Sequence, residues 1–289
     1  MKGIILAAGS GTRLSPATIP TSKVLLPIFD RPMIYYPLST LMLASVKEIL
    51  VIANERDVVS FKRTLGDGSQ FGIKIDYDIQ YVQRGISDAF IIAEKWIGEE
   101  EVVLILGDNI FYGDSLESLI KKATVSNKDA TIFGYYVDDP HRFGIVEFDN
   151  DLNVLSLKEK PQHTNSNYAV VGLYFYKKGA SEIAKTLTPS KRGELEITDL
   201  NNVYLNNDDL SVILMDEKIK WIDAGTFDSL LKASLFISDE EKTKKKKIMC
   251  PEIIAYEKGF VSREKLIEWV KANPNSDYYK MILNELTIE

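Results

Sequence analysis

Small residues and two cations follow the first apolar run of the chain. Residues 3–7 (GIILA) predict a buried strand. The loop after it contains five small residues, Ala8, Gly9, Ser10, Gly11 and Thr12. Small side chains let backbone N–H groups come close to a ligand, and several such groups around one point favour an anion. Because Arg13 and Lys23 follow and both bind phosphate oxygens, the segment indicates a ligand with several phosphates.

Two aspartates end apolar segments that lie far apart in the chain. Asp108 follows VVLILG, and Asp223 stands in WIDAGT. Carboxylates at the ends of two strands can together hold Mg²⁺, which prefers oxygen ligands and keeps waters and phosphates around it. Each aspartate could equally cap a turn, since Asn109 follows the first and Gly225 lies close after the second. The pattern leaves both interpretations open.

The composition of the chain argues against several classes of protein and of metal site. The 289 residues have a net charge of -7, which argues against a general nucleic-acid binder. With two histidines a zinc site is not expected, and no apolar stretch approaches the roughly 18 residues of a membrane helix. The single cysteine, Cys250, cannot form an internal disulfide, so we expect a cytoplasmic protein. Any metal is expected to be Mg²⁺ on carboxylates.

Strand and helix patterns alternate along the first half of the chain. Apolar or alternating runs predict strands at residues 2–8, 48–53, 74–80 and 102–107. Helical patterns lie between them, at residues 32–44, 57–65 and 87–97, with Pro37 expected to make the first of them irregular. This order predicts an α/β fold with a mostly parallel sheet and helices on both faces.

The pattern changes after residue 130, which predicts an inserted lobe. Short strands are expected at residues 131–137, 144–148, 154–159 and 168–176, and helices at 181–187, 196–205 and 227–237. We expect residues 1–240 to form the α/β body with this lobe, and residues 241–289 to form a peripheral helical segment of the same domain. The lysine run 244–247 is predicted to be a solvated connector, with a contact to a partner as the alternative.

A family resemblance runs through the chain in order. Residues 9–44, GSGTRLSPATIPTSKVLLPIFDRPMIYYPLSTLMLA, resemble the signature of the sugar-phosphate nucleotidylyltransferases. The similarity continues through LGDGSQFG, VLILGDNIFYG, IVEFDND, EKP, SNYAVVGLYFY, RGELEITDLN and WIDAGTFDSLL. The resemblance implies a Rossmann-like sheet flanked by helices with a sugar-binding lobe, the nucleotide-diphospho-sugar transferase fold.

The resemblance also implies a reaction. A nucleoside triphosphate and a sugar 1-phosphate would give a nucleotide sugar and pyrophosphate, with dTTP and glucose 1-phosphate as the expected pair. Such transfer depends on bringing two polyanions into line and spreading charge, so cations and a metal are the required parts. The sugar phosphate is largely a dianion at neutral pH, so the lack of a catalytic histidine is no objection. The family commonly forms homotetramers, and MIYYPL and CPEIIAYEKGF are expected interface segments.

Individual residues match the family's site. By resemblance, the catalytic residues are Arg13, Lys23, Asp108 and Lys160, and the metal ligands are Asp108 and Asp223. The glycine loop from Ala8 to Arg13 would hold the nucleotide together with Asp108, while Gln80 and Gly85 would contact its base. The sugar pocket would contain Gly144, Glu159, Lys160 and Val171. The chain departs from the family pattern at three positions, Asp88, Phe143 and Lys158.

Three alternatives stay open from the sequence. The first is the same reaction with UTP, because thymine differs from uracil by one methyl group. The second is a nucleotide-binding regulator that has lost catalysis, which the joint presence of the matched cations and carboxylates disfavours. The third is an NAD-dependent dehydrogenase, which is weakened because Leu14 stands where the dinucleotide fingerprint needs its third glycine.

Overall fold

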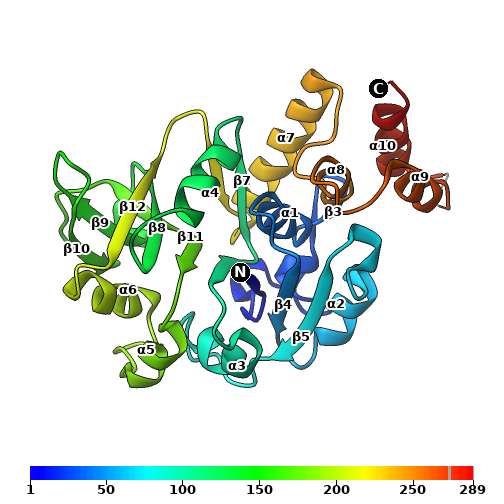
Figure 1. The fold of residues 1–289 in the computed structure, drawn as a ribbon. Coiled ribbons are helices and arrows are strands. Elements are labelled where there is room, and N and C mark those ends of the chain that lie inside the picture. The colour runs from blue at the N-terminus through cyan, green and yellow to red at the C-terminus, as the bar shows by residue number, and fades with distance from the viewer. Residues whose placement is uncertain (273–274, 289) are drawn as a thin grey trace.

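A central sheet organises the computed structural model, which describes residues 1–272 and 275–288. Within them the sheet has nine strands. They are β1 (Lys2–Leu6), β4 (Glu48–Ala53), β5 (Lys74–Ile79), β6 (Val102–Leu106), β8 (Ala130–Tyr136), β9 (Gly144–Phe148), β10 (Val154–Glu159), β11 (Tyr168–Tyr176) and β12 (Leu210–Met215). The main path runs β10-β9-β11-β6-β1-β4-β5, and β8 joins β11 to β12 (Figure 1).

The first half of the chain builds the parallel part of this sheet. β1 pairs in parallel with both β4 and β6, and β4 pairs in parallel with β5. Alternate side chains enter two separate cores: Ile5 packs in one, and Ile4 packs in the other. Burial on both faces explains why these strands are apolar without interruption. The prediction of a mostly parallel sheet covered by helices is confirmed.

The helices between these strands are α1 (Tyr35–Leu43), α2 (Val58–Leu65) and α3 (Asp88–Ile97). The sequence placed the start of the first helix at residue 32, but residues Arg31–Pro32 form β3, which pairs with β2 (Pro27–Ile28). The expected irregularity at Pro37 was wrong. Pro37 lies in the first turn of α1, where the missing N–H has no partner within the helix.

The second half of the chain adds an antiparallel lobe. β11 pairs antiparallel with β6, β8 and β9, and β10 continues from β9. Helices α5 (Ala180–Thr186) and α6 (Ile197–Asn206) lie beside these strands, on the left of Figure 1. A separate two-stranded ladder joins β7 (Asn109–Tyr112) to β13 (Lys220–Asp223). The sequence did not predict this ladder, β12 or α4 (Leu116–Thr124).

The C-terminal segment is helical, as expected, but it is joined to the body by buried charges. α7 (Phe227–Lys244) runs from the body across residue 240, and α8 (Pro251–Glu257), α9 (Arg263–Lys271) and α10 (Asp277–Ile288) follow it. Lys247, expected in a solvated connector, is 5% exposed, and its ammonium donates to Glu241 Oε2 at 2.7 Å. Arg31 Nη2 donates to Glu241 Oε1, also at 2.7 Å. Lys244, Lys245 and Lys246 are exposed, as expected for a solvated connector. The prediction was wrong for Lys247 alone, because charge in the sequence does not reveal a buried partner. The division at residue 240 stays a prediction.

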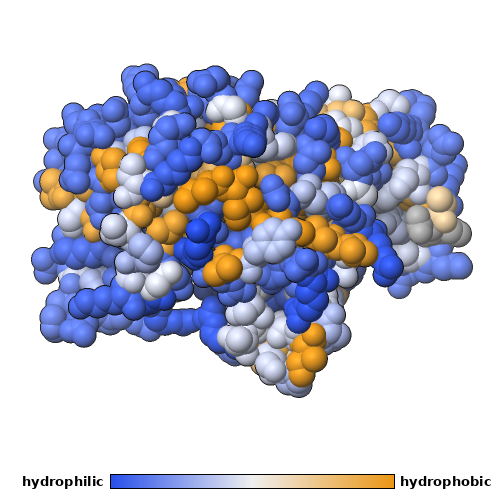
Figure 2. All heavy atoms as spheres, turned by 90° about the horizontal axis from the view of Figure 1, so that it is seen from below, coloured by the Kyte–Doolittle hydropathy of each residue, from blue (hydrophilic) through white to orange (hydrophobic). Residues whose placement is uncertain are grey.

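The surface is mixed in polarity. Viewed from below, apolar side chains gather across the middle of one face, with hydrophilic side chains around them (Figure 2). Among the described residues, no helix combines the length and the apolar character needed to cross a membrane.

Candidate active site

Asp108 lies at the carboxyl end of β6, beside the end of β1. Its side chain is largely buried and forms an ion pair with Lys23, which begins a short 3-10 helix (Lys23–Leu25). Asn109 Nδ2 also donates to Asp108 Oδ1 at 3.1 Å. Burial alone would raise the pKa of Asp108, but Lys23 and the hydrogen bonds outweigh it and lower the pKa below its ordinary value. Asp108 is therefore held as an oriented anion.

Asp223, from the second half of the chain, lies next to Asp108. It stands opposite Asn109 in the β13–β7 ladder, and Ala224 N donates to the carbonyl oxygen of Asp108 at 3.0 Å. Burial raises the pKa of Asp223, and the negative charge of Asp108 raises it further. Lys23 and Arg13 oppose these effects. The β13–β7 ladder and this backbone hydrogen bond hold the two aspartates next to each other.

Arg13 reaches Asp223 because Gly225 carries no side chain. A Cβ at Gly225 would lie 2.7 Å from Arg13 Nη2 and 2.9 Å from Asp223 Oδ1. The structure thus brings together Arg13, Lys23, Asp108 and Asp223, four residues that the sequence singled out. Two cations beside two carboxylates form a site that can hold a polyphosphate together with a divalent ion.

The glycine loop borders the same site. Gly9 and Thr12 are exposed, Gly11 is half-buried, and Ala8 is buried. A Cβ at Gly9 would lie 3.2 Å from Lys23 Cε, so the loop and Lys23 are adjacent. Gly11 adopts φ 64°, which glycine takes without strain. Ala8 O accepts a hydrogen bond from Gln83 Nε2 at 2.8 Å, a contact that the sequence analysis missed.

Gln80 and Gly85 make contacts with other residues of the chain. Gln80 is 5% exposed, and its Nε2 donates to Asp88 Oδ2 at 2.9 Å and to Gly85 O at 3.3 Å. Gly85 has φ 104°, and a Cβ there would lie 2.5 Å from Leu195 O. Close approach does require this glycine, but the approaching group in the structure is backbone of the lobe. Contact of either residue with a nucleotide base stays a prediction.

A cavity of about 130 Å³ opens next to Asp223 and contains most of the predicted sugar-binding residues. Gly144, Glu159 and Lys160 line it. Thr198 Oγ1 donates to Glu159 Oε2 at 2.7 Å, which fixes that carboxylate. A Cβ at Gly144 would lie 3.2 Å from the same Glu159 oxygen, so a larger residue would crowd it. The cavity therefore offers an oriented acceptor and a cation beside the two aspartates.

Val171 is placed differently from its neighbours. Its side chain is fully buried in the core, whereas Val170 and Gly172 line the cavity. Successive residues of a strand point to opposite faces, so the side chain of Val171 points away from the cavity that its two neighbours line. A role of Val171 in sugar binding stays a prediction.

Asn109 connects the two halves of the site, although the sequence analysis treated it only as a turn residue. Its Oδ1 accepts from Trp221 Nε1 at 2.7 Å and from Gly172 N at 3.1 Å, while its amide donates to Asp108. Other missed residues line the cavity: Arg142, Thr198 and Trp221. The position of Asn109 directly after Asp108 was the available signal, but its partners are distant in sequence.

Comparison with known proteins assigns the chain to a family. Residues 2–240 match the nucleotidyl transferase family, which is most of the sequence. The chain belongs to that family. This nucleotidyl transferase is 50% identical over 286 residues to a Neisseria meningitidis protein named glucose-1-phosphate thymidylyltransferase, with 99% of each chain covered. A protein of the same name from Mycolicibacterium smegmatis is 46% identical over 289 residues and is covered completely, as is this chain.

Solved structures agree with the fold of this nucleotidyl transferase. A Bacillus anthracis protein, provisionally assigned as a glucose-1-phosphate thymidylyltransferase and crystallised with sucrose, is 39% identical with a TM-score of 0.76. The match covers 82% of this chain and 94% of that one. A UDP-glucose pyrophosphorylase bound to UDP-glucose is 23% identical with a TM-score of 0.73, over 83% and 98% of the two chains. This second likeness shows the fold alone.

Proposed function

We propose that this nucleotidyl transferase transfers a thymidylyl group from dTTP to α-D-glucose 1-phosphate, releasing pyrophosphate and forming dTDP-glucose. The observation that carries the proposal is the meeting of Arg13, Lys23, Asp108 and Asp223 beside the cavity that contains Lys160. Full-length relatives at 46–50% identity are named for this reaction. The arrangement of these residues and the names of the relatives together support this activity.

Each charged residue of the site is assigned to one part of the substrates according to its charge. We assign the glycine loop, through its backbone N–H groups, to the triphosphate, with Arg13 and Lys23 neutralising its phosphates. Lys160 orients the phosphate of the sugar substrate, and Glu159 accepts from a sugar hydroxyl group. An oxygen of the sugar phosphate attacks the α-phosphorus in line, and the bond to the departing pyrophosphate breaks. No covalent intermediate with the protein is required.

Asp108 and Asp223 suit a magnesium ion. They are two adjacent carboxylates, and Asp223 is disfavoured as an anion there by burial and by Asp108. A divalent cation between them would remove that conflict, and Mg²⁺ binds through one or two carboxylates plus substrate phosphates. When bound, the ion would supply charge neutralisation for the phosphates. We assign these two residues as its protein ligands.

Two further features belong to the proposal. We place the protein in the cytoplasm, because Cys250 is a buried free thiol. We also propose a homo-oligomer, a tetramer by resemblance, but with a different surface from the one expected. Segment 33–38 (MIYYPL) is buried within the chain, as are residues 250–255 of CPEIIAYEKGF, so these residues are not free to form an interface. Residues 256–260 of that segment are half-buried or exposed. The supporting surface is the exposed stripe on α7: Phe227, Leu231 and Leu235.

A substrate matrix tests the function. Purified protein with Mg²⁺ is incubated with each of dTTP, UTP, ATP and GTP against glucose 1-phosphate, galactose 1-phosphate and mannose 1-phosphate, and pyrophosphate release is measured. We expect the highest kcat/KM for dTTP with glucose 1-phosphate. One methyl group in a pocket is worth only about 1–3 kcal/mol, so UTP is expected to react more slowly rather than not at all. A preference for UTP would replace the proposed nucleotide, and no release with any pair would reject the activity.

A further inference from the structure

Gln80 stands at the edge of the sheet that also carries the glycine loop. It follows the last residue of β5, and β5, β4 and β1 pair in parallel in that order, so their carboxyl ends share one edge. Gln83, three residues further on, donates from Nε2 to Ala8 O at 2.8 Å, which ties this segment to the glycine loop. The base of a triphosphate bound in that loop is therefore expected beside the segment.

The side-chain amide of Gln80 can take only one of its two orientations. Its Nε2 donates to Asp88 Oδ2 at 2.9 Å and to Gly85 O at 3.3 Å. Carboxylate and carbonyl oxygens only accept hydrogen bonds, so the amide nitrogen has to face them. Turning the amide over would place its oxygen against two other oxygens. The orientation of this amide thus follows from the chemistry of its partners.

Asp88 is itself held in place by a cation. It is the first residue of α3 and is 1% exposed, and its Oδ1 accepts from Arg84 Nη2 at 2.7 Å. A carboxylate is costly to bury unless its charge is paired and its oxygens are hydrogen-bonded. Here one oxygen binds the guanidinium of Arg84 and the other binds the amide of Gln80. The start of α3 adds partial positive charge close to this carboxylate.

The oxygen of the same amide is left for a ligand. Within the residues that the structure describes, Gln80 Oε1 accepts no hydrogen bond. It still touches solvent, although the residue as a whole is only 5% exposed, in contrast to the sealed and unpartnered hydroxyl of Ser39. An amide oxygen can only accept a hydrogen bond. Gln80 therefore offers an acceptor to a bound base and keeps its donor for Asp88.

We propose that Asp88 is a positioning residue for base recognition: it turns Gln80 Oε1 toward N3 of the base, where thymine and uracil carry an N–H group. This inference rests on the proposed function of the nucleotide site. Cytosine has a bare nitrogen at N3, so two acceptors would face each other without a proton between them. Asp88 thereby favours thymine and uracil over cytosine without contacting the base. It is also one of the three positions at which the chain departs from the family pattern.

Isothermal titration calorimetry with dTTP and 5-methyl-dCTP tests the proposal on the full-length protein with Mg²⁺ and without a sugar phosphate. The two bases share the methyl group and differ only in the group at position 4 and in the N–H at N3. We expect the wild type to bind dTTP about 30-fold more tightly or better. In Asp88→Asn the new amide oxygen stays with Arg84 and its nitrogen faces Gln80, so the Gln80 amide turns over. The ratio of the two Kd values should then fall by about 10-fold.

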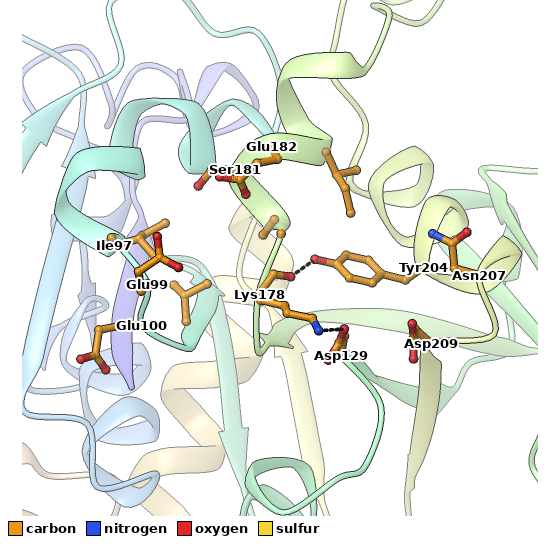
Figure 3. A pocket seen from close by; sticks show the side chains of 15 residues that line it. Ile97, Glu99, Glu100, Asp129, Lys178, Ser181, Glu182, Tyr204, Asn207 and Asp209 are labelled. Carbon is orange, nitrogen blue, oxygen red and sulfur yellow. Dashed lines mark hydrogen bonds and ion pairs between the residues drawn. The ribbon is translucent and has the colours of Figure 1, made fainter.

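Asp129→Asn is the matched control, because it makes the same change in an ion-paired aspartate on the far side of α3. Lys178 Nζ lies 3.4 Å from Asp129 Oδ2, and both residues line a cavity of about 380 Å³ together with Ile97, the last residue of α3 (Figure 3). The length of α3, about 15 Å, separates this end of the helix from Asp88. The Kd ratio of the control should stay within about twofold of the wild-type ratio.

Two results would overturn the proposal. One is a wild type that binds the two nucleotides equally or binds neither. The other is an unchanged Kd ratio in folded Asp88→Asn, with thermal unfolding as the measure of folding. If that variant does not fold, Asp88→Ser replaces it, because a hydroxyl can donate to Gln80 as well as accept, and the ratio should again fall.

The assay separates this inference from the proposed function. No sugar phosphate is present, so a failure of the transfer reaction appears only in the substrate matrix. Tighter binding of UTP than of dTTP would change the proposed nucleotide but would support the role of Asp88, since uracil carries the same N–H group.

Discussion

Asp223 stands directly opposite Asn109 across the β13–β7 ladder, and Asn109 holds the carboxylate of Asp108 at 3.1 Å. The ladder therefore brings together two acidic residues that are more than a hundred positions apart in the sequence. It also explains why the site depends on both halves of the chain. Any shift of register between β7 and β13 would separate the proposed metal ligands.

Removing charge from the site should lower turnover strongly without unfolding the protein. We expect Asp108→Asn and Arg13→Ala each to lower kcat by about 10²–10³, the usual effect of removing a group that stabilises transition-state charge. Pyrophosphate release measures the rate, and circular dichroism with thermal unfolding monitors the fold. Turnover like that of the wild type in both variants would contradict the assigned roles.

A methyl group at Gly225 should disturb the site locally. The Cβ of Gly225→Ala would lie 2.7 Å from Arg13 Nη2 and 2.9 Å from Asp223 Oδ1. Arg13 is exposed and can move aside, so we expect a Tm close to that of the wild type. Because Arg13 then leaves its position, kcat/KM for dTTP should fall by about 10-fold or more. A large fall in Tm with unchanged activity per folded molecule would argue against this explanation.

The buried charges between Arg31 and α7 should contribute strongly to stability. Glu241 is 2% exposed and accepts from both Arg31 and Lys247. Glu241→Ala leaves two buried cations with Asp30 as their remaining shared carboxylate. We therefore expect the free energy of unfolding to fall by about 3 kcal/mol, the lower end of the cost of breaking a buried ion pair. Urea denaturation measures it. The matched control is Lys232→Ala, which breaks the exposed Lys232–Asp228 pair and should leave stability close to the wild-type value.

The stability of the C-terminal region should depend on pH through Glu252. Burial raises the pKa of Glu252, and its Oε1 has no hydrogen-bond partner. The folded protein therefore holds a proton that the unfolded chain releases near the ordinary pKa of 4.5. The contribution of Glu252 is fully present below that pH and is lost as the pH rises through the raised pKa.

Urea unfolding from pH 4 upwards (about one pH unit per step) compares the wild type with Glu252→Gln, which cannot titrate. We expect the wild type to lose stability relative to the variant as the pH rises. Parallel profiles for the two proteins would show that the pKa of Glu252 is not raised in the folded state.

Much of the fold and part of the site could be predicted from the sequence, because they follow local rules. Uninterrupted apolar runs indicate strands that are buried on both faces, and the alternation with helices implies a parallel sheet. Parallel strands bring their carboxyl ends to one edge, so the glycine loop after β1 and Asp108 after β6 had to be neighbours. Arg13 and Lys23 were recognisable from charge beside small residues.

Contacts across long sequence distances were not predictable in this way. Gln80 is a polar residue expected to contact a nucleotide base, yet its side-chain amide donates to the carboxylate of Asp88. Lys247 belongs to a charged run, yet its ammonium is buried against Glu241. Residue type and spacing determined the strands, the glycine loop and the candidate charges. Only the tertiary structure decided which charges meet, because burial and electrostatic pairing depend on distances that the order of residues does not contain.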